Sequence, residues 1–354
     1  MDVVEARSFA RAGFLGNPSD GYFGKTVSFT FTEFFVDLKL AESSRLRFVP
    51  GEVDDATFSS PEALVRDLRL YGYYGGIRML KAVSKLFFEY CMDHGIDLPK
   101  RNFTAEYKIN IPRLVGLSGS SAICSAMLKA LMKFYGVEIP LEECPTICLE
   151  AERDELGIAC GLQDRVIQMY NGMVYMDFER SLVEKTGHGR YERLFPGGGV
   201  DPDRLGLYIA YDPARAEESG KAHKKVKRLF EQKNSDVVSA MKDFASIAEA
   251  GRSALLKGDT AELGRLVNAN FDLRDRIFNV AEENRRMVMT ARAAGASAKF
   301  AGSGGAITGL CEDGEMFDRL VAKLGETGCR VIRPKIATAA DEQAALAASG
   351  WRNS

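Results

Sequence analysis

The sequence lacks the features that mark several large classes of protein. Its 354 residues contain no run of about 18 apolar residues, which a membrane-spanning helix would need. Lysine and arginine (47) do not outnumber aspartate and glutamate (49), so there is no basic excess of the kind that binds nucleic acid or an anionic membrane. We therefore expect neither a nucleic-acid nor a membrane partner.

Cysteine and histidine are too few and too scattered to form a disulfide framework or a zinc site. The seven cysteines are odd in number, and most lie in apolar surroundings, as reduced core thiols do. Cys144 and Cys148 are four residues apart, but no second ligand pair follows them and the three histidines are dispersed. The first residues have neither the basic nor the apolar region of a signal peptide. These observations predict a cytoplasmic protein.

What the chain does have is ample apolar sequence, 46%, for one large or two ordinary domains. Alternating polar and apolar residues predict strands at 7–15 and 26–40. Further strands are expected at 103–109 and 205–211, and helices at 61–95, 122–135, 141–156, 216–232, 235–257, 260–280 and 282–294. Because strands and helices mix without regular alternation, we expect an α+β fold. The Gly- and Pro-rich stretch 196–202 predicts two domains, 1–198 and 199–354.

The segment 111–122 is the most informative stretch of the chain. Gly116 and Gly119 allow unusual backbone conformations and close approach to a ligand, and three serines add hydroxyl groups. A helix is predicted directly after this loop, and the N-terminus of a helix attracts anions through its free N–H groups and dipole. The Gly-Lys-Ser/Thr ending of a P-loop is missing. The loop therefore indicates an anion site, although a serine-rich helix cap is the simpler alternative.

Two further segments occur with this loop, 7–20 near the N-terminus and 299–306 near the C-terminus. In their order and spacing the three segments resemble motifs 1, 2 and 3 of the superfamily named for galactokinase, homoserine kinase, mevalonate kinase and phosphomevalonate kinase (GHMP). The superfamily's central motif, Pro-x-x-x-Gly-Leu-Gly-Ser-Ser-Ala, stands here with one extra serine. The strings 16–20, 22–26, 116–121, 155–158, 161–165 and 299–306 resemble its glucuronokinase branch, and the resemblance runs from about Arg7 to about Pro334.

The resemblance implies a fold, an activity and cofactors. The implied fold has an N-terminal domain with a mixed sheet and a left-handed βαβ-type nucleotide loop, and a ferredoxin-like α+β C-terminal domain. The implied reaction transfers the γ-phosphoryl group of ATP to O1 of D-glucuronate, with Mg²⁺ required, and the glucuronate 1-phosphate feeds UDP-glucuronate synthesis. A monomer or homodimer is expected. The alternatives are a 1-kinase for galacturonate, arabinose or galactose, and a catalytically silent sugar sensor.

The resemblance also assigns the catalytic residues. Asp164 matches the catalytic aspartate, and a carboxylate can accept the proton of an anomeric hydroxyl as the new bond forms. Arg11 matches the basic residue that faces this aspartate, and it would keep Asp164 ionised and stabilise charge on the transferred group. Without the motifs, Asp164 reads as a helix N-cap and Arg11 as a half-buried strand arginine.

The same comparison assigns the nucleotide and metal ligands. The loop residues expected to hold ATP are Gly116, Leu117, Ser118, Gly119, Ser120, Ser121 and Ala122. Glu152 lies twelve residues before Asp164, which matches the family's metal-binding glutamate. Ser121 is its expected partner on Mg²⁺, and Ser120 is the alternative because of the extra serine. On composition alone Glu152 would belong to a solvated helix face.

The substrate is expected to contact the first and third motifs. Asp20 matches the sugar-binding aspartate, and carboxylates bind vicinal hydroxyls through paired hydrogen bonds. Asn17 and Pro18 replace the usual Glu-His before it. Gly302, Ser303 and Gly304 of motif 3 should close over the substrate. The candidates for the partner of a substrate carboxylate are Arg7, Lys25, Arg165 and Lys299, with Lys25 slightly preferred, and residues 73–76 are a candidate border of the adenine pocket.

Overall fold

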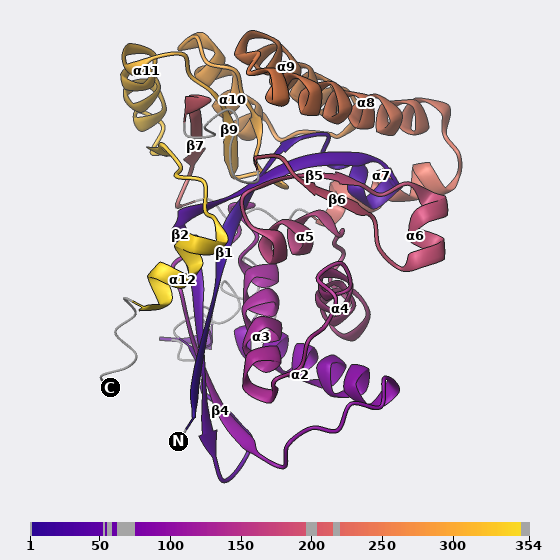
Figure 1. Ribbon diagram of the computed structural model, residues 1–354. Helices are drawn as coiled ribbons and strands as arrows, with labels where there is room; N and C mark the ends of the chain where they lie inside the picture. The colour runs from indigo at the N-terminus through magenta and orange to yellow at the C-terminus, as the bar shows by residue number, and fades with distance from the viewer. Residues whose placement is uncertain are drawn as a thin grey trace.

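A computed structural model describes residues 2–51, 54, 59–61, 75–195, 204–214 and 220–347. Its elements form two sheets, each with helices packed against it (Figure 1). The first sheet has the order β3-β4-β2-β5-β6, and β1 pairs with β2 off this path. Its strands are β1 (Val3–Leu15), β2 (Lys25–Ser43), β3 (Arg47–Phe48), β4 (Asn102–Ile109), β5 (Met173–Asp177) and β6 (Arg190–Arg193).

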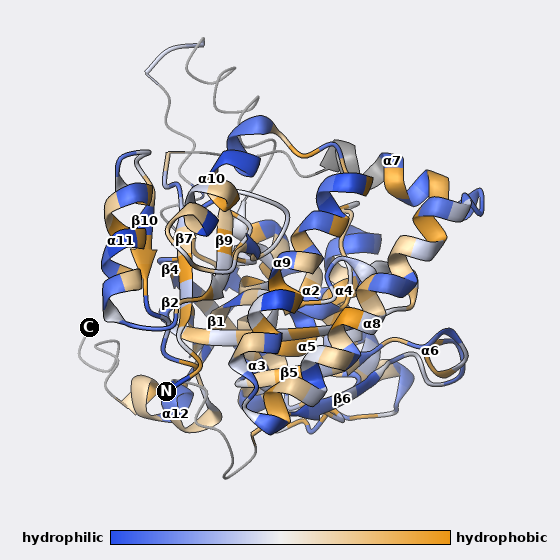
Figure 2. Cartoon of the chain, turned by 90° about the horizontal axis from the view of Figure 1, so that it is seen from above, coloured by the Kyte–Doolittle hydropathy of each residue, from blue (hydrophilic) through white to orange (hydrophobic). Residues whose placement is uncertain are grey.

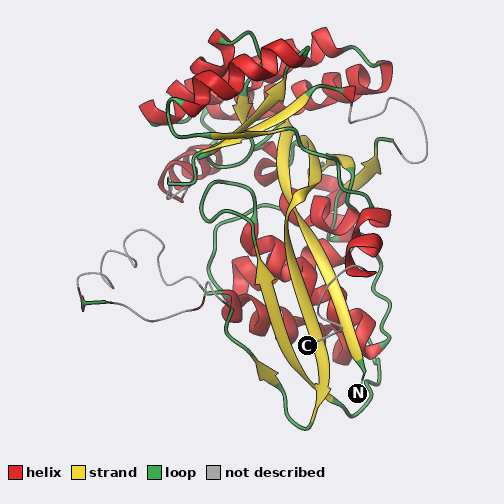
Figure 3. Ribbon diagram, turned by 90° about the vertical axis from the view of Figure 1, so that its left-hand side faces the viewer, coloured by secondary structure: helices red, strands yellow, loops and turns green. Residues whose placement is uncertain are grey.

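The long hairpin of β1 and β2 is the frame of the first sheet (Figure 3). β2 pairs antiparallel with β1, β4 and β5, while β3 and β4 are parallel, so the sheet is mixed. The register of β1 on β2 shifts between Phe9 and Ala10. Such irregularities bend a strand and redirect its side chains. This shift comes just before Arg11, the predicted catalytic arginine.

Helices cover one face of the first sheet. They are α2 (Gly76–Asp93), α3 (Gly119–Tyr135), α4 (Cys144–Glu150), a π-helical turn η3 (Ala151–Glu155), α5 (Gln163–Tyr170) and α6 (Arg180–Thr186). α3 is buried almost all round, because it lies between β1 and β2 on one side and α2 and α4 on the other (Figure 1). Its N-terminus therefore has a fixed position.

The second sheet is antiparallel with the order β10-β7-β9-β8. Its strands are β7 (Leu207–Tyr211), β8 (Lys299–Phe300), β9 (Ala306–Leu310) and β10 (Arg330–Ile332). The helices of this part are α7 (Gly220–Glu231), α8 (Ser235–Lys257), α9 (Thr260–Ile277), α10 (Glu282–Ala293) and α11 (Gly314–Gly325). Hydrophilic and hydrophobic residues alternate along α11 (Figure 2). Its buried residues, Met316, Leu320 and Leu324, are spaced one helical turn apart.

α8 and α9 form a helical hairpin whose ends the sequence specifies. Asn234 and Asp259 cap the two N-termini by accepting backbone hydrogen bonds from Val237 and Glu262. Gly258 ends α8 with φ +70°, the left-handed conformation that glycine adopts most easily. The hairpin matters for function because its second helix contacts the first motif: Asn270 of α9 accepts from the Gly16 N–H and donates to the Asn17 carbonyl.

The α+β prediction is confirmed, and most predicted elements are present with shifted ends. The helix predicted at 141–156 is instead α4 followed by the π-helical turn, so the helical repeat changes just where Glu152 stands. The helix predicted to begin at 61 and the division at 198/199 both involve residues outside those described. The last described helix, α12 (Ala339–Ala347), lies beside β1, where Glu342 pairs with Lys129 of α3.

Among the described helices, none combines the length and the apolar character that crossing a membrane requires.

Candidate active site

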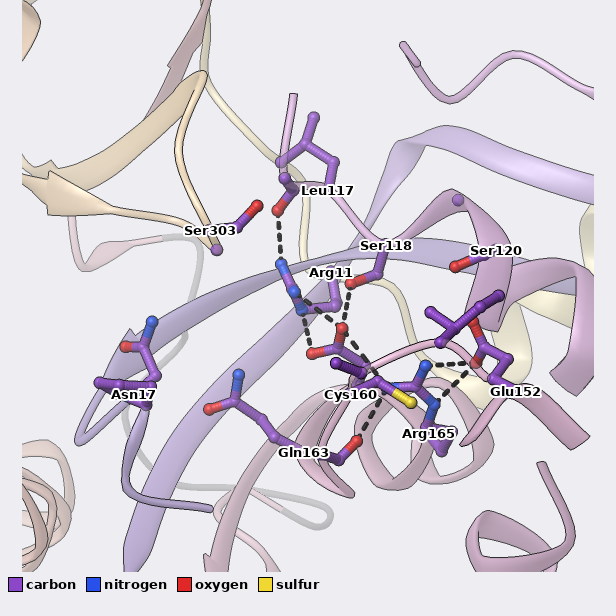
Figure 4. A pocket seen from close by; sticks show the side chains of 18 of the residues that line it. Arg11, Asn17, Leu117, Ser118, Ser120, Glu152, Cys160, Gln163, Arg165 and Ser303 are labelled. Carbon is purple, nitrogen blue, oxygen red and sulfur yellow. Dashed lines mark hydrogen bonds and ion pairs between the residues drawn. The ribbon is translucent and has the colours of Figure 1, made fainter. Parts of the chain in front are cut away.

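A cavity of about 390 Å³ opens between the two sheets. It is lined by the turn η1 (Ser19–Tyr22), by residues 109–120 before and at the start of α3, by residues from Glu152 to Arg165, by one residue each of α7 and α9, and by Gly302 and Ser303. The three sequence motifs, far apart in the chain, therefore meet at one cavity. Figure 4 shows how their side chains converge.

Arg11 occupies the junction of the three motifs. Its Nε and Nη2 donate to the two carboxylate oxygens of Asp164 at 2.7 and 2.9 Å. Its Nη1 donates to the Gly116 carbonyl at 2.6 Å and to the Ala301 carbonyl at 3.0 Å. The residue is only 5% exposed, so one guanidinium holds the predicted base and both glycine-rich loops together.

Asp164 stands in the first turn of α5 and reaches the cavity with a side chain that is 22% exposed. Burial alone would raise the pKa of Asp164, but the Arg11 guanidinium, the nearby Arg165 and a hydrogen bond from Ser118 together hold that pKa well below its usual range. The carboxylate is therefore ionised at neutral pH, and it has only a weak tendency to keep a proton.

Ser118 contributes to this arrangement in a way that the motif comparison does not predict. Its Oγ donates to Asp164 at 2.6 Å. Its backbone has φ +62°, which is uncommon for a residue other than glycine, and its carbonyl accepts from Gln168 at 3.0 Å. The extra serine of the motif thus holds the predicted base, and the one signal for it in the sequence was the insertion itself.

The glycines of motifs 2 and 3 allow their loops to touch. Gly116 has φ +79°, and a Cβ there would lie 2.6 Å from the Gly304 carbonyl oxygen. A Cβ at Gly302 would collide with the Gly116 carbonyl oxygen. Arg274 of α9 secures the other side of this contact by donating to the carbonyls of Gly302 and Ser303, each at 2.9 Å. The two loops therefore form one rigid rim.

Glu152 and Arg165 form a buried ion pair next to the start of α3. Glu152 is 0% exposed, and Arg165 donates to its Oε2 through Nε at 2.8 Å and through Nη2. The other oxygen, Oε1, is buried and has no hydrogen-bond partner. A buried carboxylate oxygen left without a partner suits a cation or a water, since such groups are otherwise costly to bury.

The two candidate metal serines differ in their placement. Ser120 lines the cavity together with Glu152 (Figure 4). Ser121 is buried, its hydroxyl donates to the Ser118 carbonyl at 3.3 Å, and it is not one of the cavity-lining residues. Within the described residues, no group of three or more His, Cys, Asp or Glu side chains could hold a metal by itself. A cation here would need other oxygen ligands, as Mg²⁺ bound to phosphates has.

Asp20 and Asn17 bring motif 1 to the cavity. The Asp20 carboxylate packs against Gly161, where no side chain would fit, and accepts from the Gln163 N–H at 3.4 Å. Burial, and next the charge of Asp164, raise the pKa of Asp20 to about 6. The Asn17 side-chain oxygen accepts a hydrogen bond from the buried Lys299 at 2.6 Å, and this contact orients the Asn17 amide.

The four cations proposed for a substrate carboxylate are all engaged elsewhere. Lys25 lies outside the cavity lining and pairs with Glu249 and Asp177. Arg7 pairs with Asp37, and Arg165 pairs with Glu152. Lys299 is buried and donates to two carbonyls and to Asn17. Burial and the nearby Arg274 and Arg11 lower the pKa of Lys299 well below its usual value. The structure does not bring Lys25, the preferred candidate, to the site.

Sequence reasoning also missed several cavity residues, among them Tyr22, Gln163, Lys227 and Arg274. Lys227 and Arg274 come from α7 and α9, more than 200 residues after motif 1. No local pattern marks them, because only the packing of the helices of the second part on motif 1 brings them to the cavity. The adenine candidates 73 and 74 lie outside the described residues.

The arrangement combines an ionised carboxylate held by an arginine, a Gly/Ser loop at a helix N-terminus, and a second carboxylate with a raised pKa. The loop N–H groups and the α3 dipole favour an anion. The ionised carboxylate can orient a hydroxyl and accept its proton. These are the components of a site that transfers a phosphoryl group to a hydroxyl.

Comparison with known proteins places this geometry among related chains. The model of the GHMP kinases N terminal domain matches residues 78–172, and the model of the GHMP kinases C terminal domain matches residues 252–328. The chain is 44% identical over 338 residues to Glucuronokinase 1 of Arabidopsis thaliana, covering 93% of this chain and 89% of that one. It is 46% identical to Probable glucuronokinase 2 of the same plant, covering 93% and 88%.

Solved structures agree with the fold. The galactokinase of Lactococcus lactis in complex with galactose superposes with a TM-score of 0.73 at 15% identity, covering 95% of this chain and 94% of that one. At this identity the likeness concerns the fold alone.

The two carboxylates of the cavity give a direct test of its electrostatics. We expect the Asp20 carboxyl to titrate near pH 6, and Asp164→Asn to lower that midpoint, because the neighbouring negative charge is removed. The measurement is a carbon-13 NMR titration of the aspartate carboxyl groups. Asp318→Asn, which changes an exposed aspartate of α11 that does not line the cavity, is the control and should leave the Asp20 midpoint unchanged. A wild-type Asp20 midpoint near 4 would contradict this description of the site.

Proposed function

The chain belongs to the GHMP kinase family, and within it we propose an ATP-dependent sugar-acid 1-kinase that converts D-glucuronate and ATP to glucuronate 1-phosphate and ADP. The observation that carries the proposal is the Arg11–Asp164 pair at the contact of the two glycine-rich loops, beside Asp20. The glucuronate assignment rests on the two Arabidopsis relatives, which share almost the whole chain and are named glucuronokinases.

Asp164 is proposed to act on the attacking hydroxyl. Because its pKa is held low, it is a weak base in the resting site, and it would first orient the anomeric O1–H by accepting its hydrogen bond. The hydroxyl becomes more acidic as its oxygen bonds to phosphorus, and only then would the proton pass to the carboxylate. Arg11 would keep the carboxylate ionised until that point and place positive charge next to the transferred group.

The loop before α3 is proposed to hold the ATP phosphates. Residues 116–120 line the cavity, and the N–H groups at the start of α3 have no helical partners of their own. Arg11 fixes this loop through the Gly116 carbonyl, which leaves the loop N–H groups available to phosphate oxygens. The expected partners are therefore backbone donors more than side chains.

Mg²⁺ fits the residues present beside this loop. Glu152 would offer Oε1, its unpartnered oxygen, and Ser120 would offer the hydroxyl that lines the cavity. We prefer Ser120 to Ser121 because the Ser121 hydroxyl is buried against the Ser118 carbonyl. When bound, the ion would neutralise phosphate charge, and Mg²⁺ usually takes only one or two protein ligands besides phosphates.

The fold is compatible with two other functions. A 1-kinase for galacturonate, arabinose or galactose would use the same loops and the same base, so only substrate comparison separates it. A silent sugar sensor would not need an ionised base held against the phosphate loop. The Arg11–Asp164 geometry therefore favours an active kinase.

The substrate assignment is tested with a coupled ADP-release assay over glucuronate, galacturonate, glucose, galactose and arabinose. A pocket built for a carboxylate leaves its polar partners unpaired with a neutral sugar, so we expect kcat/KM for glucuronate to exceed that for glucose by at least ~100-fold. Equal rates with glucose would overturn the uronate assignment, and no ADP release with any sugar would favour the sensor.

The base is tested by Asp164→Asn, which keeps the shape and removes the proton acceptor. We expect kcat to fall by roughly 100-fold or more, with ATP binding nearly unchanged. Asp318→Asn, an exposed aspartate of α11 outside the cavity lining, is again the matched control and should keep the wild-type rate. A kcat within threefold of wild type for Asp164→Asn would exclude this role.

The metal ligands are tested by comparing Ser120→Ala with Ser121→Ala. We expect Ser120→Ala to raise the Mg²⁺ concentration that gives half-maximal rate, because an oxygen ligand is lost, and Ser121→Ala to leave it nearly unchanged. The reverse result would assign the metal to Ser121. Glu152→Gln should also raise the Mg²⁺ requirement, but it breaks the buried pair with Arg165 and should lower the melting temperature as well.

A further inference from the structure

A uronate differs from the corresponding neutral sugar by a carboxylate at C6, and the cavity must meet that charge. If the proposed function holds, one cationic side chain of the cavity should bind this carboxylate. Six cationic residues line the cavity: Arg11, Arg113, Arg153, Arg165, Lys227 and Arg274. Their partners in the structure differ sharply.

Three of the six are matched by carboxylates of the protein. Arg11 is bound bidentately by Asp164, Arg165 is buried against Glu152, and Arg153 donates twice to its neighbour Asp154. A substrate carboxylate at any of them would have to compete with a carboxylate already in place. None of these three is suited to distinguish a uronate from a neutral sugar.

Two others belong to the glycine-rich loops or are bound to them. Arg274 uses both terminal nitrogens on the carbonyls of Gly302 and Ser303, and it lies beneath that loop as a buried residue. Arg113 belongs to the loop that leads into α3, where the phosphates are proposed to bind. Lys227 is the remaining cation.

Lys227 lines the cavity near the turn that carries Asp20. It stands on α7, three residues before Phe230, and residues three apart are neighbours on a helix surface. Phe230 packs edge-on against Tyr22 with ring centroids 4.9 Å apart. Tyr22 is on the same short turn as Asp20, the proposed partner of the sugar hydroxyls. The contact of α7 with this turn therefore places Lys227 on the same side of the cavity as Asp20.

Lys227 is exposed, and within the described part of the chain it forms an ion pair with no carboxylate. An ammonium group on a flexible stem at a cavity wall can close on an anionic group when one binds. We propose that Lys227 binds the C6 carboxylate of the substrate and is the residue that makes the enzyme select sugar acids over neutral sugars.

The test compares Lys227→Met with wild type on glucuronate, galacturonate and glucose. Lys227→Met should lower kcat/KM for both uronates by roughly 10- to 100-fold, the scale of a hydrogen bond to a charged group, and leave glucose nearly unchanged. The ratio between the two uronates should stay constant, because they differ at C4 and not at C6. Lys227→Arg should recover part of the loss.

Lys225→Met is the matched control, since Lys225 is an exposed lysine of the same helix that does not line the cavity. It should keep the wild-type preference, and neither variant should change KM for ATP or the melting temperature. If Lys227→Met keeps the wild-type ratio of glucuronate to glucose within threefold, the assignment of Lys227 is wrong although the uronate kinase stands. If wild type itself shows no preference for uronates, the proposed function fails instead.

Discussion

The guanidinium of Arg11 is the interaction on which the site depends. It binds Asp164 through two nitrogens and the carbonyls of Gly116 and Ala301 through the third. Its strand, β1, thereby connects α5, the loop before α3 and the third motif. Because a buried charge is costly unless its hydrogen bonds are satisfied, these partners also fix one another. The planar guanidinium of Arg11 holds both the proposed base and the proposed phosphate loop. It therefore sets the distance between Asp164 and this loop.

The charge of Arg11 also gives the two carboxylates of the cavity different pKa values. Asp164 is ionised because Arg11, Arg165 and Ser118 surround it, whereas burial and the charge of Asp164 raise the pKa of Asp20 to about 6. Two acids close together cannot both ionise freely, and an unequal supply of cations decides which one does. Position relative to one arginine thus separates a carboxylate that stays ionised, Asp164, from one that can hold a proton near neutral pH, Asp20.

The sequence predicts the parts of this site whose residues are fixed by local pattern. Arg11, Asp164 and the glycine-rich loops follow from the motifs shared with the GHMP family. The local sequence alone would indicate a strand arginine, a helix N-cap and a serine-rich turn. Lys25 is not available to a substrate carboxylate, because it pairs with Glu249 and Asp177. These partners are 152 or more residues away in the sequence, so no local pattern indicates them. Lys227, and Arg274 which holds the Gly302–Ser303 loop, cannot be predicted from local sequence for the same reason. They reach the cavity only through the packing of α7 and α9 on motif 1, and amphipathic helices carry no local sign of which polar residue faces a ligand.

The buried pair of Glu152 and Arg165 is better explained by function than by stability. Replacing a buried ion pair with apolar residues is often neutral or favourable, so such a pair is weak support for stability. Here one oxygen of Glu152 takes both contacts from Arg165, and the other has no partner. The π-helical turn shifts the helical repeat at this residue, as such turns often do at functional sites. An arrangement that leaves a buried carboxylate oxygen without a partner is costly in the protein alone. A cation bound there, as proposed, would supply the missing partner.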